Sequence, residues 1–116
     1  EGKLDGMAMR VPVPDGSIVD LAAYLETSVT KADIDEAMKT AAEGYLDGIL
    51  DYTEEELVSS DYIGNPYSAV YDSEKTTVMQ DNHVKVLAWY DNEWGYSNRI
   101  VELAQIAAGE KETIAE

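Results

Sequence analysis

Cysteine is absent from this chain of 116 residues. Its absence excludes a disulfide framework and any thiol nucleophile within the sequence. Long hydrophobic runs are also missing, because no segment approaches the ~20 consecutive apolar residues of a membrane helix. The first residues lack the basic flank and apolar stretch of a signal peptide. We therefore predict a cytoplasmic protein with no membrane-spanning segment.

Positive charge is scarce: 8 lysines and arginines accompany 24 acidic residues, for a formal net charge of -16. This imbalance repels nucleic acid, anionic lipid and phosphate ligands at long range, so neither nucleic acid nor a membrane is expected as a partner. Repulsion between the carboxylates acts over about 10 Å at ~0.1 M salt and over only about 3 Å at ~1 M salt. The acidic composition is explained either by a halophilic source with a salty cytoplasm or by a surface redesigned for solubility.

Several common ligand motifs are absent as well. The acidic clusters at residues 33–36 and 51–56 lack the Asp-x-Asp-x-Asp-Gly spacing of a calcium loop, so no metal site is predicted. No Gly-x-Gly-x-x-Gly sequence follows a predicted strand, so no dinucleotide-binding Rossmann domain is encoded in this sequence. His83, the only histidine, lies in a polar turn and is interpreted as a solvated turn residue.

The length predicts one compact domain that buries roughly 65% of the surface exposed by the unfolded chain. Alternation of apolar residues predicts a hairpin, in which strand 7–11 leads through a turn at 12–16 to strand 18–25. A helix is predicted over 31–43, because Thr30 is a suitable cap and Asp33 stands three residues on.

Further strands and a second helix follow. The short strands are predicted at 48–52, 69–71, 76–79 and 84–90, and the second helix at 93–108. This helix is expected to bury one apolar face, formed by Tyr96, Ile100, Leu103, Ala104 and Ala107. Hairpins rather than regular crossovers predict an α+β fold, with an antiparallel or mixed sheet and the helices packed on one face.

The most informative segment is VKVLAWYDNEWGYSNR, residues 84–99, where strand periodicity changes to helix periodicity near Asp91. Asn92 and Glu93 follow Asp91 at this change. The surrounding rings are Trp89, Tyr90, Trp94 and Tyr96. We expect the rings to shield the polar cluster from water and to form a pocket for a flat heterocyclic ligand.

The run WYDNEWGYSNR closely resembles the end of the catalytic domain of phosphorylating, NAD-dependent glyceraldehyde-3-phosphate dehydrogenases. Segments 2–21, 41–66 and the hairpin leading into Val84 agree with that family in the same order. The resemblance implies that residues 1–108 are part of the catalytic domain and that 109–116 are an acidic tail, predicted to fray. It also implies a glycolytic parent enzyme that oxidises an aldehyde through a thioester and passes hydride to NAD.

Arg10 is one of two arginines and lies within the apolar stretch 7–11, where an unpaired charge is costly. One interpretation places its guanidinium at an edge, reaching water or pairing with Asp20. The other is an anion clamp, because a guanidinium can hold a phosphate with two charge-assisted hydrogen bonds. The resemblance implies the second role, in which Arg10 binds the substrate phosphate.

Asn92 has two interpretations also: a cap for the second helix, or a ligand contact through its amide. The resemblance implies that Asn92 holds the nicotinamide carboxamide, that Tyr96 lies beside the nicotinamide ring and that Tyr90 lines the catalytic pocket. Without the resemblance, both tyrosines are simply core residues. Glu93 either complements the helix dipole or lines the pocket.

The sequence contains no cysteine nucleophile, so no catalytic residue is assigned and the chain alone is expected to bind no cofactor and to be inactive. The alternative is a stand-alone or engineered acidic scaffold or interaction domain without enzymatic activity. Expected partners are a second copy of the chain, paired through open sheet edges or through the sheet face, or a second chain that supplies the Rossmann domain and the nucleophile.

Overall fold

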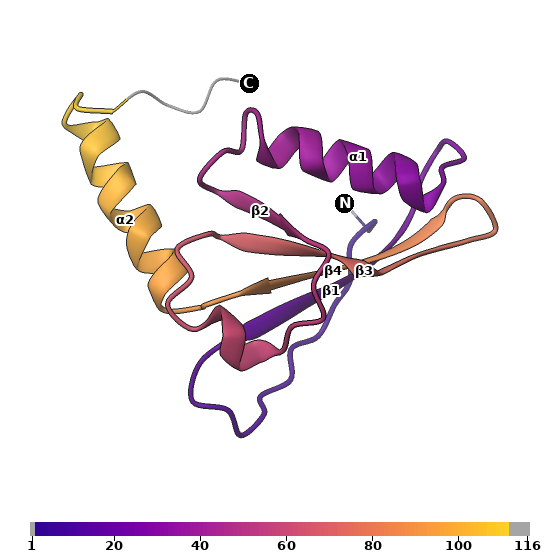
Figure 1. Ribbon diagram of the computed structural model, residues 1–116, viewed down its shortest axis with the longest axis horizontal. Helices are drawn as coiled ribbons and strands as arrows, with labels where there is room; N and C mark the ends of the chain where they lie inside the picture. Colours follow the sequence, from indigo (N-terminus) through magenta and orange to yellow (C-terminus); the bar gives the residue numbers. More distant parts are fainter. Residues whose placement is uncertain (1, 112–116) are drawn as a thin grey trace.

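The computed structural model describes residues 2–111, which form one mixed sheet and two α-helices (Figure 1). In chain order the elements are β1 (Ser17–Tyr24), α1 (Lys31–Ala42), β2 (Leu50–Thr53), the 3-10 helix η1 (Ser59–Tyr62), β3 (Ala69–Met79), β4 (His83–Tyr90) and α2 (Trp94–Ala107). The predicted tail at 109–116 falls largely outside the described residues.

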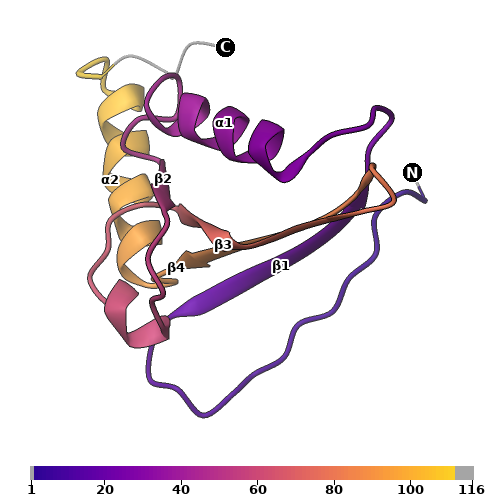
Figure 2. The same ribbon diagram turned by 45° about the vertical axis from the view of Figure 1, so that its right-hand side comes forward.

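The four strands lie in the order β1-β4-β3-β2. β4 pairs antiparallel with both β1 and β3, whereas β2 runs parallel to β3. Figure 2 shows both helices on the same side of the sheet, with α1 lying across the face and α2 standing at one end. The α+β prediction with a mixed sheet is therefore confirmed. The core lies between α1 and the sheet and centres on Ile34, Tyr71 and Val84.

The start of α1 follows from its local sequence. The hydroxyl of Thr30 accepts a hydrogen bond from the backbone N–H of Asp33 at 3.2 Å, and the Asp33 carboxylate accepts one from the backbone N–H of Thr30 at 2.7 Å. These two bonds satisfy backbone donors that a helix start leaves free. The predicted helix is confirmed to within one residue at its C-terminal end.

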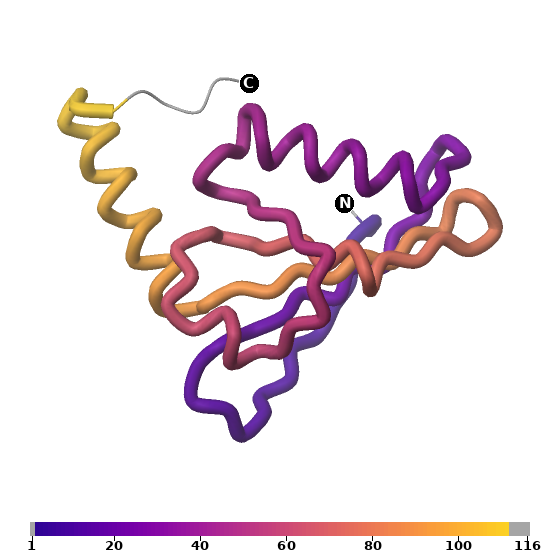
Figure 3. The backbone as a smooth tube through the Cα atoms, in the orientation of Figure 1, coloured from indigo at the N-terminus to yellow at the C-terminus, as the bar shows by residue number. Residues whose placement is uncertain are grey.

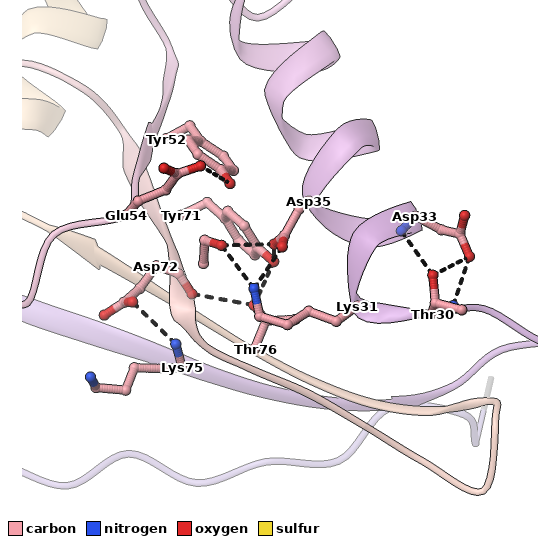
Figure 4. Close-up of polar contacts among 11 residues, drawn as sticks. Thr30, Lys31, Asp33, Asp35, Tyr52, Glu54, Tyr71, Asp72, Lys75 and Thr76 are labelled. Carbon is pink, nitrogen blue, oxygen red and sulfur yellow. Dashed lines mark hydrogen bonds and ion pairs between the residues drawn. The ribbon is translucent and has the colours of Figure 1, made fainter.

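A polar network joins α1 to the middle of β3 (Figure 4). The Asp35 carboxylate accepts hydrogen bonds from Tyr71 Oη at 2.7 Å and Ser73 Oγ at 3.0 Å, and it pairs with Lys31 Nζ at 2.6 Å. Burial opposes ionisation of Asp35, but these hydrogen bonds together lower its pKa below the usual value. The network fixes α1 over the sheet.

The two strands predicted at 69–71 and 76–79 are one strand, β3, whose register with β4 shifts between Asp72 and Thr77. The buried Asp72 carboxylate accepts hydrogen bonds from Lys75 N at 3.2 Å and from Trp89 Nε1 at 3.0 Å. Polar side chains occupy the positions at this register shift, so the apolar alternation is interrupted there while the strand continues. The interruption explains why the pattern indicated two strands.

The predicted strand at 7–11 is wrong, and so is the hairpin that it would have formed with β1. Residues 2–16 contain no helix or strand, and Met7 and Met9 are 82% and 80% exposed. Pro12 and Pro14 explain the difference, because each fixes its φ angle and lacks the N–H that a ladder needs. The backbone trace shows this segment running apart from the sheet before the chain turns back into β1 (Figure 3).

The apolar face predicted for α2 is exposed rather than buried among residues 2–111. The solvent-exposed side chains include Tyr96, Ile100, Leu103, Ala104 and Ala107. α2 contacts the rest of the described chain near its start, where Gly95 lies against the carbonyl of Tyr67, and through Arg99, whose Nη1 donates to the carbonyl of Gly48 at 2.9 Å. Helical periodicity identified an apolar face but not what covers it.

Candidate functional site

The strand-to-helix change between β4 and α2 is organised by Asp91, which is 2% exposed. Its Oδ1 accepts hydrogen bonds from the backbone N–H groups of Glu93 at 2.9 Å and Trp94 at 2.8 Å. Its Oδ2 accepts one from the backbone N–H of Gly64 at 2.8 Å, in the loop after η1. Asp91 therefore caps α2 and ties the helix start to a loop from a distant part of the sequence.

Two carboxylates share this junction with opposite electrostatic outcomes. Burial opposes ionisation of Asp91, but the backbone hydrogen bonds from Gly64, Trp94 and Glu93 lower its pKa to about 2. Partial desolvation and the hydrogen bond to Asp91 raise the pKa of Asp15 above its ordinary value. Asp91 is thus the ionised member of the pair and Asp15 takes up the proton more readily.

The Asn92 side chain is held by the start of β1 rather than by α2. Its Oδ1 accepts hydrogen bonds from the backbone N–H of Gly16 at 3.1 Å and from Ser17 Oγ at 3.0 Å. The interpretation of Asn92 as the cap of α2 is wrong by one residue, because Asp91 makes those bonds. Within residues 2–111 the Asn92 amide nitrogen donates to no protein acceptor.

Asn92 lies between two cavities. The first, of about 340 Å³, is lined by Arg10, Glu93, Asn92 and the segment that leads into β1. The second, of about 300 Å³, is lined by Tyr90, Tyr96, Arg99 and Asn92. All five residues singled out from the sequence therefore line these two neighbouring cavities, and Asn92 belongs to both.

Arg10 is exposed and makes no ion pair within the described part of the chain. The pairing with Asp20 considered from the sequence is wrong, since Asp20 Oδ2 lies 2.9 Å from Lys85 Nζ. Arg10 instead contributes a guanidinium to a cavity that also contains Asp15 and Glu93. A guanidinium whose N–H donors are not used in an ion pair suits an anion such as a phosphate. The neighbouring carboxylates confine the attraction of its positive charge to short distances.

The four aromatic rings do not enclose the polar cluster. Trp89 stacks on Tyr62 with ring centroids 5.4 Å apart and donates its Nε1 hydrogen to Asp72, away from Asn92. Trp94 and Tyr96 are 53% and 67% exposed. Because alternate residues of a strand face opposite sides, only Tyr90 from β4 accompanies Tyr96 at the second cavity.

Two residues that build this junction, Gly16 and Ser17, were not singled out from the sequence, and Asp91 was named in the polar cluster without a role of its own. Asp91 had a usable signal, because an aspartate directly after a strand and before a helix is a preferred N-cap. Gly16 and Ser17 had none, since their bonds to Asn92 join segments more than 70 residues apart. Gly16 has a φ of 96°, and a Cβ there would lie 3.2 Å from the Ser59 carbonyl oxygen.

Other features of the described residues add no competing site. A larger open hollow of about 680 Å³ lies along α1, β2 and η1, but its lining includes none of the five predicted substrate- and coenzyme-site residues. No group of three His, Cys, Asp or Glu side chains within residues 2–111 is arranged to hold a metal ion. His83 is not a free turn residue: it begins β4, and its ring stacks on Tyr24 at 4.4 Å.

Neither helix among the described residues has the length and apolar character that crossing a bilayer requires. The two cavities that adjoin Asn92 combine arginine guanidinium, amide and aromatic groups in their linings.

Comparison with known proteins identifies a family model and several relatives that match most of this chain. The family model for the glyceraldehyde 3-phosphate dehydrogenase C-terminal domain matches residues 1–92. Glyceraldehyde-3-phosphate dehydrogenase 2 of Bacillus subtilis is 56% identical over 108 residues, which cover 93% of this chain and 32% of the relative. The Streptomyces avermitilis protein of the same name is 55% identical over 103 residues, covering 89% of this chain and 31% of the relative. A cytosolic enzyme of Pinus sylvestris is 53% identical over 102 residues.

Proposed function

We propose that this chain, which belongs to the glyceraldehyde 3-phosphate dehydrogenase family as its C-terminal domain, supplies one side of a substrate and coenzyme site. The chain spans about a third of the length of the relatives that it matches. Arg10 binds the phosphate of glyceraldehyde 3-phosphate, and Asn92 with Tyr96 binds the nicotinamide ring of NAD. The complete enzyme would oxidise and phosphorylate the aldehyde through a thioester, as a cytoplasmic enzyme of glycolysis.

One observation carries this proposal: Arg10 and Asn92, from opposite ends of the chain, line the same cavity. A phosphorylated aldehyde presents its anion and its reacting carbon at opposite ends of a short molecule. A site for its oxidation therefore needs an anion-binding group and a coenzyme-binding group within one small space. Arg10 offers a fork of N–H donors, and Asn92 offers an amide next to the cavity that Tyr90 and Tyr96 line.

The residues fit a nicotinamide coenzyme in their hydrogen bonding. Within residues 2–111 the Asn92 nitrogen is left without a protein acceptor, so it can donate to a ligand. Tyr96 presents a largely exposed ring at the second cavity, which can pack against a flat heterocycle. When bound, nicotinamide accepts a hydride. Arg10 meanwhile holds the substrate phosphate, and Tyr90 lines the wall between β4 and α2.

The chain by itself is expected to produce no NADH from glyceraldehyde 3-phosphate, because its sequence contains no cysteine to form the thioester. Joining residues 2–108 to the preceding part of the Bacillus subtilis enzyme, in place of that enzyme's own matching segment, is expected to restore turnover. NADH formation followed by absorbance measures both results. The chimera should reach activity within about tenfold of the unaltered relative, because the replaced segment is more than half identical.

A fold control makes the chimera interpretable. A chimera with Cys replaced by Ala at the nucleophile supplied by the relative should keep its folding transition but lose turnover. A folded chimera that binds neither substrate nor NAD would contradict the proposed function. Restored turnover on mixing this chain with a separate N-terminal part would instead support the two-chain form of the same proposal.

Exposed apolar surface favours self-association of the chain. On β1, Ile18, Val19 and Leu21 are exposed, and α2 exposes Ile100 and Leu103. Burying such surface is worth roughly 25 cal/mol per Å². Static light scattering in ~1 M salt should give a mass above that of one chain. A monomer with cooperative unfolding would instead favour the second candidate, a stand-alone acidic scaffold or interaction domain without enzymatic activity.

A further inference from the structure

We propose that Ser17, together with the backbone N–H of Gly16, is a positioning residue that locks the Asn92 amide with its nitrogen turned toward the ligand. The site then recognises a carbonyl oxygen on a flat ring and does not recognise an N–H donor. The lock is a property of this chain alone, whereas the identity of the ligand rests on the proposed function.

The orientation of the Asn92 amide follows from the donor that faces it. A backbone N–H can only donate, so the Asn92 atom 3.1 Å from Gly16 N must be the oxygen. Rotating the amide by 180° would place two donors face to face and would leave the backbone N–H without this acceptor. Ser17 Oγ, at 3.0 Å from the same oxygen, can turn its hydrogen toward it.

The Ser17 bond matters more than its exposed position suggests. The Gly16 N–H is shared, because it also donates to Asp15 Oδ1 at 2.8 Å. A shared donor restrains the Asn92 oxygen less than an undivided one. Ser17 Oγ therefore supplies the hydrogen bond that is not divided with Asp15.

The sheet holds Ser17 in place relative to Asn92. Ser17 is the first residue of β1 and stands opposite Tyr90, the last residue of β4. Asn92 follows Tyr90 by two residues, after the buried Asp91. Because the antiparallel register fixes both strand ends, the lock is mounted on paired backbone rather than on a free loop.

The lock sets the chemical character of the site. With Oδ1 accepting two hydrogen bonds from β1, the group that remains for a ligand is the amide NH2. Asn92 adjoins both cavities, so this donor serves a ring at Tyr96 and a substrate at Arg10. An aromatic carboxamide or an aromatic ketone offers the required acceptor. A ring substituent that can only donate leaves the NH2 unpaired and binds less well.

The lock can be tested on this chain without coenzyme, by ¹⁵N–¹H NMR of the Asn92 side-chain amide, assigned through its loss in Asn92→Asp. Ser17→Ala should shift the Asn92 NH2 signals and increase their solvent exchange several-fold. Ser17→Thr should restore the original signals, because it keeps the hydroxyl. Unchanged Asn92 signals in Ser17→Ala, with β1 signals also unchanged, would overturn the lock.

The recognition of a carbonyl oxygen is tested in the chimera, with NAD and with its 3-acetylpyridine analogue, which keeps the carbonyl oxygen but lacks the NH2. Ser17→Ala should raise KM for both coenzymes about fivefold with little change in kcat, and Ser17→Thr should reverse this. Asn92→Asp keeps an acceptor for Gly16 and Ser17 but removes the donor, so it should weaken both coenzymes alike.

The NMR experiment tests whether Ser17 positions Asn92, and the kinetics of the chimera test whether Asn92 contacts the carbonyl oxygen of the coenzyme. An Asn92→Asp effect on NAD but not on the acetylpyridine analogue would show that the amide contacts the nicotinamide NH2, which overturns the recognition of the carbonyl. A folded chimera without coenzyme binding would contradict the proposed function, while the NMR result would still decide whether Ser17 positions Asn92.

Discussion

Arg10→Ala in the chimera is expected to lower kcat/KM for glyceraldehyde 3-phosphate about 100-fold, because charge-assisted hydrogen bonds to phosphate are each worth roughly 1.5–3 kcal/mol. Arg10 makes no ion pair within residues 2–111, so its removal breaks no salt bridge described in the structure. The loss should therefore appear in kinetics rather than in the free energy of unfolding. Initial rates over a range of substrate concentrations measure it.

Two comparisons make this result specific to the phosphate. Unphosphorylated glyceraldehyde should be turned over at the same kcat/KM by Arg10→Ala and by the unmutated chimera. Lys85→Ala removes one positive charge from β4, where Lys85 pairs with Asp20, and should leave both substrates unaffected. Equal losses for the phosphorylated and unphosphorylated aldehydes would show that Arg10 supports the fold or another step, and not phosphate binding.

Asp91→Ala is expected to destabilise the chain by about 3 kcal/mol, because it removes a helix cap and a tertiary hydrogen bond together. The Glu93 and Trp94 N–H groups lose the cap, and the Gly64 N–H loses its link to the start of α2. Asp91→Asn should cost less, since one amide oxygen can still cap the helix while its NH2 meets a second donor at Gly64. Urea unfolding of the two variants measures the difference.

The same residue gives stability a defined dependence on pH. The pKa of Asp91 falls from 3.8 to about 2 in the folded chain, so the folded state is more stable with Asp91 ionised than with Asp91 protonated. This contribution, of about 2 kcal/mol, is present above about pH 4 and is lost as the pH falls toward 2. Asp15 has a raised pKa and acts in the opposite direction.

The Asp91 contribution is best isolated in an Asp15→Asn background, which removes the neighbouring carboxylate that titrates with it. In that background, urea unfolding between pH 5 and pH 2 should show a loss of stability that Asp91→Asn reduces by about 2 kcal/mol, the remainder coming from other carboxylates with a lowered pKa, such as Asp35. A loss that persists unchanged in Asp91→Asn would assign the pH dependence to other carboxylates, such as Asp35, whose pKa is also lowered.

Much of the local structure could be predicted because its causes lie within a few residues. Thr30 and Asp33 cap α1 through bonds three residues apart, and β4 ends where its alternation ends, at Tyr90. Predictions failed where a pattern needed a distant partner. The alternation at 7–11 finds no partner strand among residues 2–111, and the apolar periodicity of α2 does not state what lies against it.

The candidate site divides in the same way. Arg10, Tyr90, Asn92, Glu93 and Tyr96 could be chosen from motif resemblance, and the structure brings them to two adjoining cavities. Of the two roles considered for Asn92, the cap is wrong, because the sequence offers two possible caps at the junction and Asp91 is the one that accepts the bonds. Only burial distinguishes them: Asp91 is enclosed against Gly64, whereas Asn92 is turned toward β1.

The sequence by itself determined the family, the helix at α1, the change from strand to helix after Tyr90 and the lack of a thiol nucleophile. These depend on composition and on spacings of two to four residues, which the backbone geometry of strands and helices imposes locally. The tertiary structure decided that β2 runs parallel to β3, that Asp91 is clamped by Gly64, and that Ser17 orients Asn92. Those contacts join segments far apart in the chain, and they form only where burial and paired strands compensate the entropy of closing the loops between them.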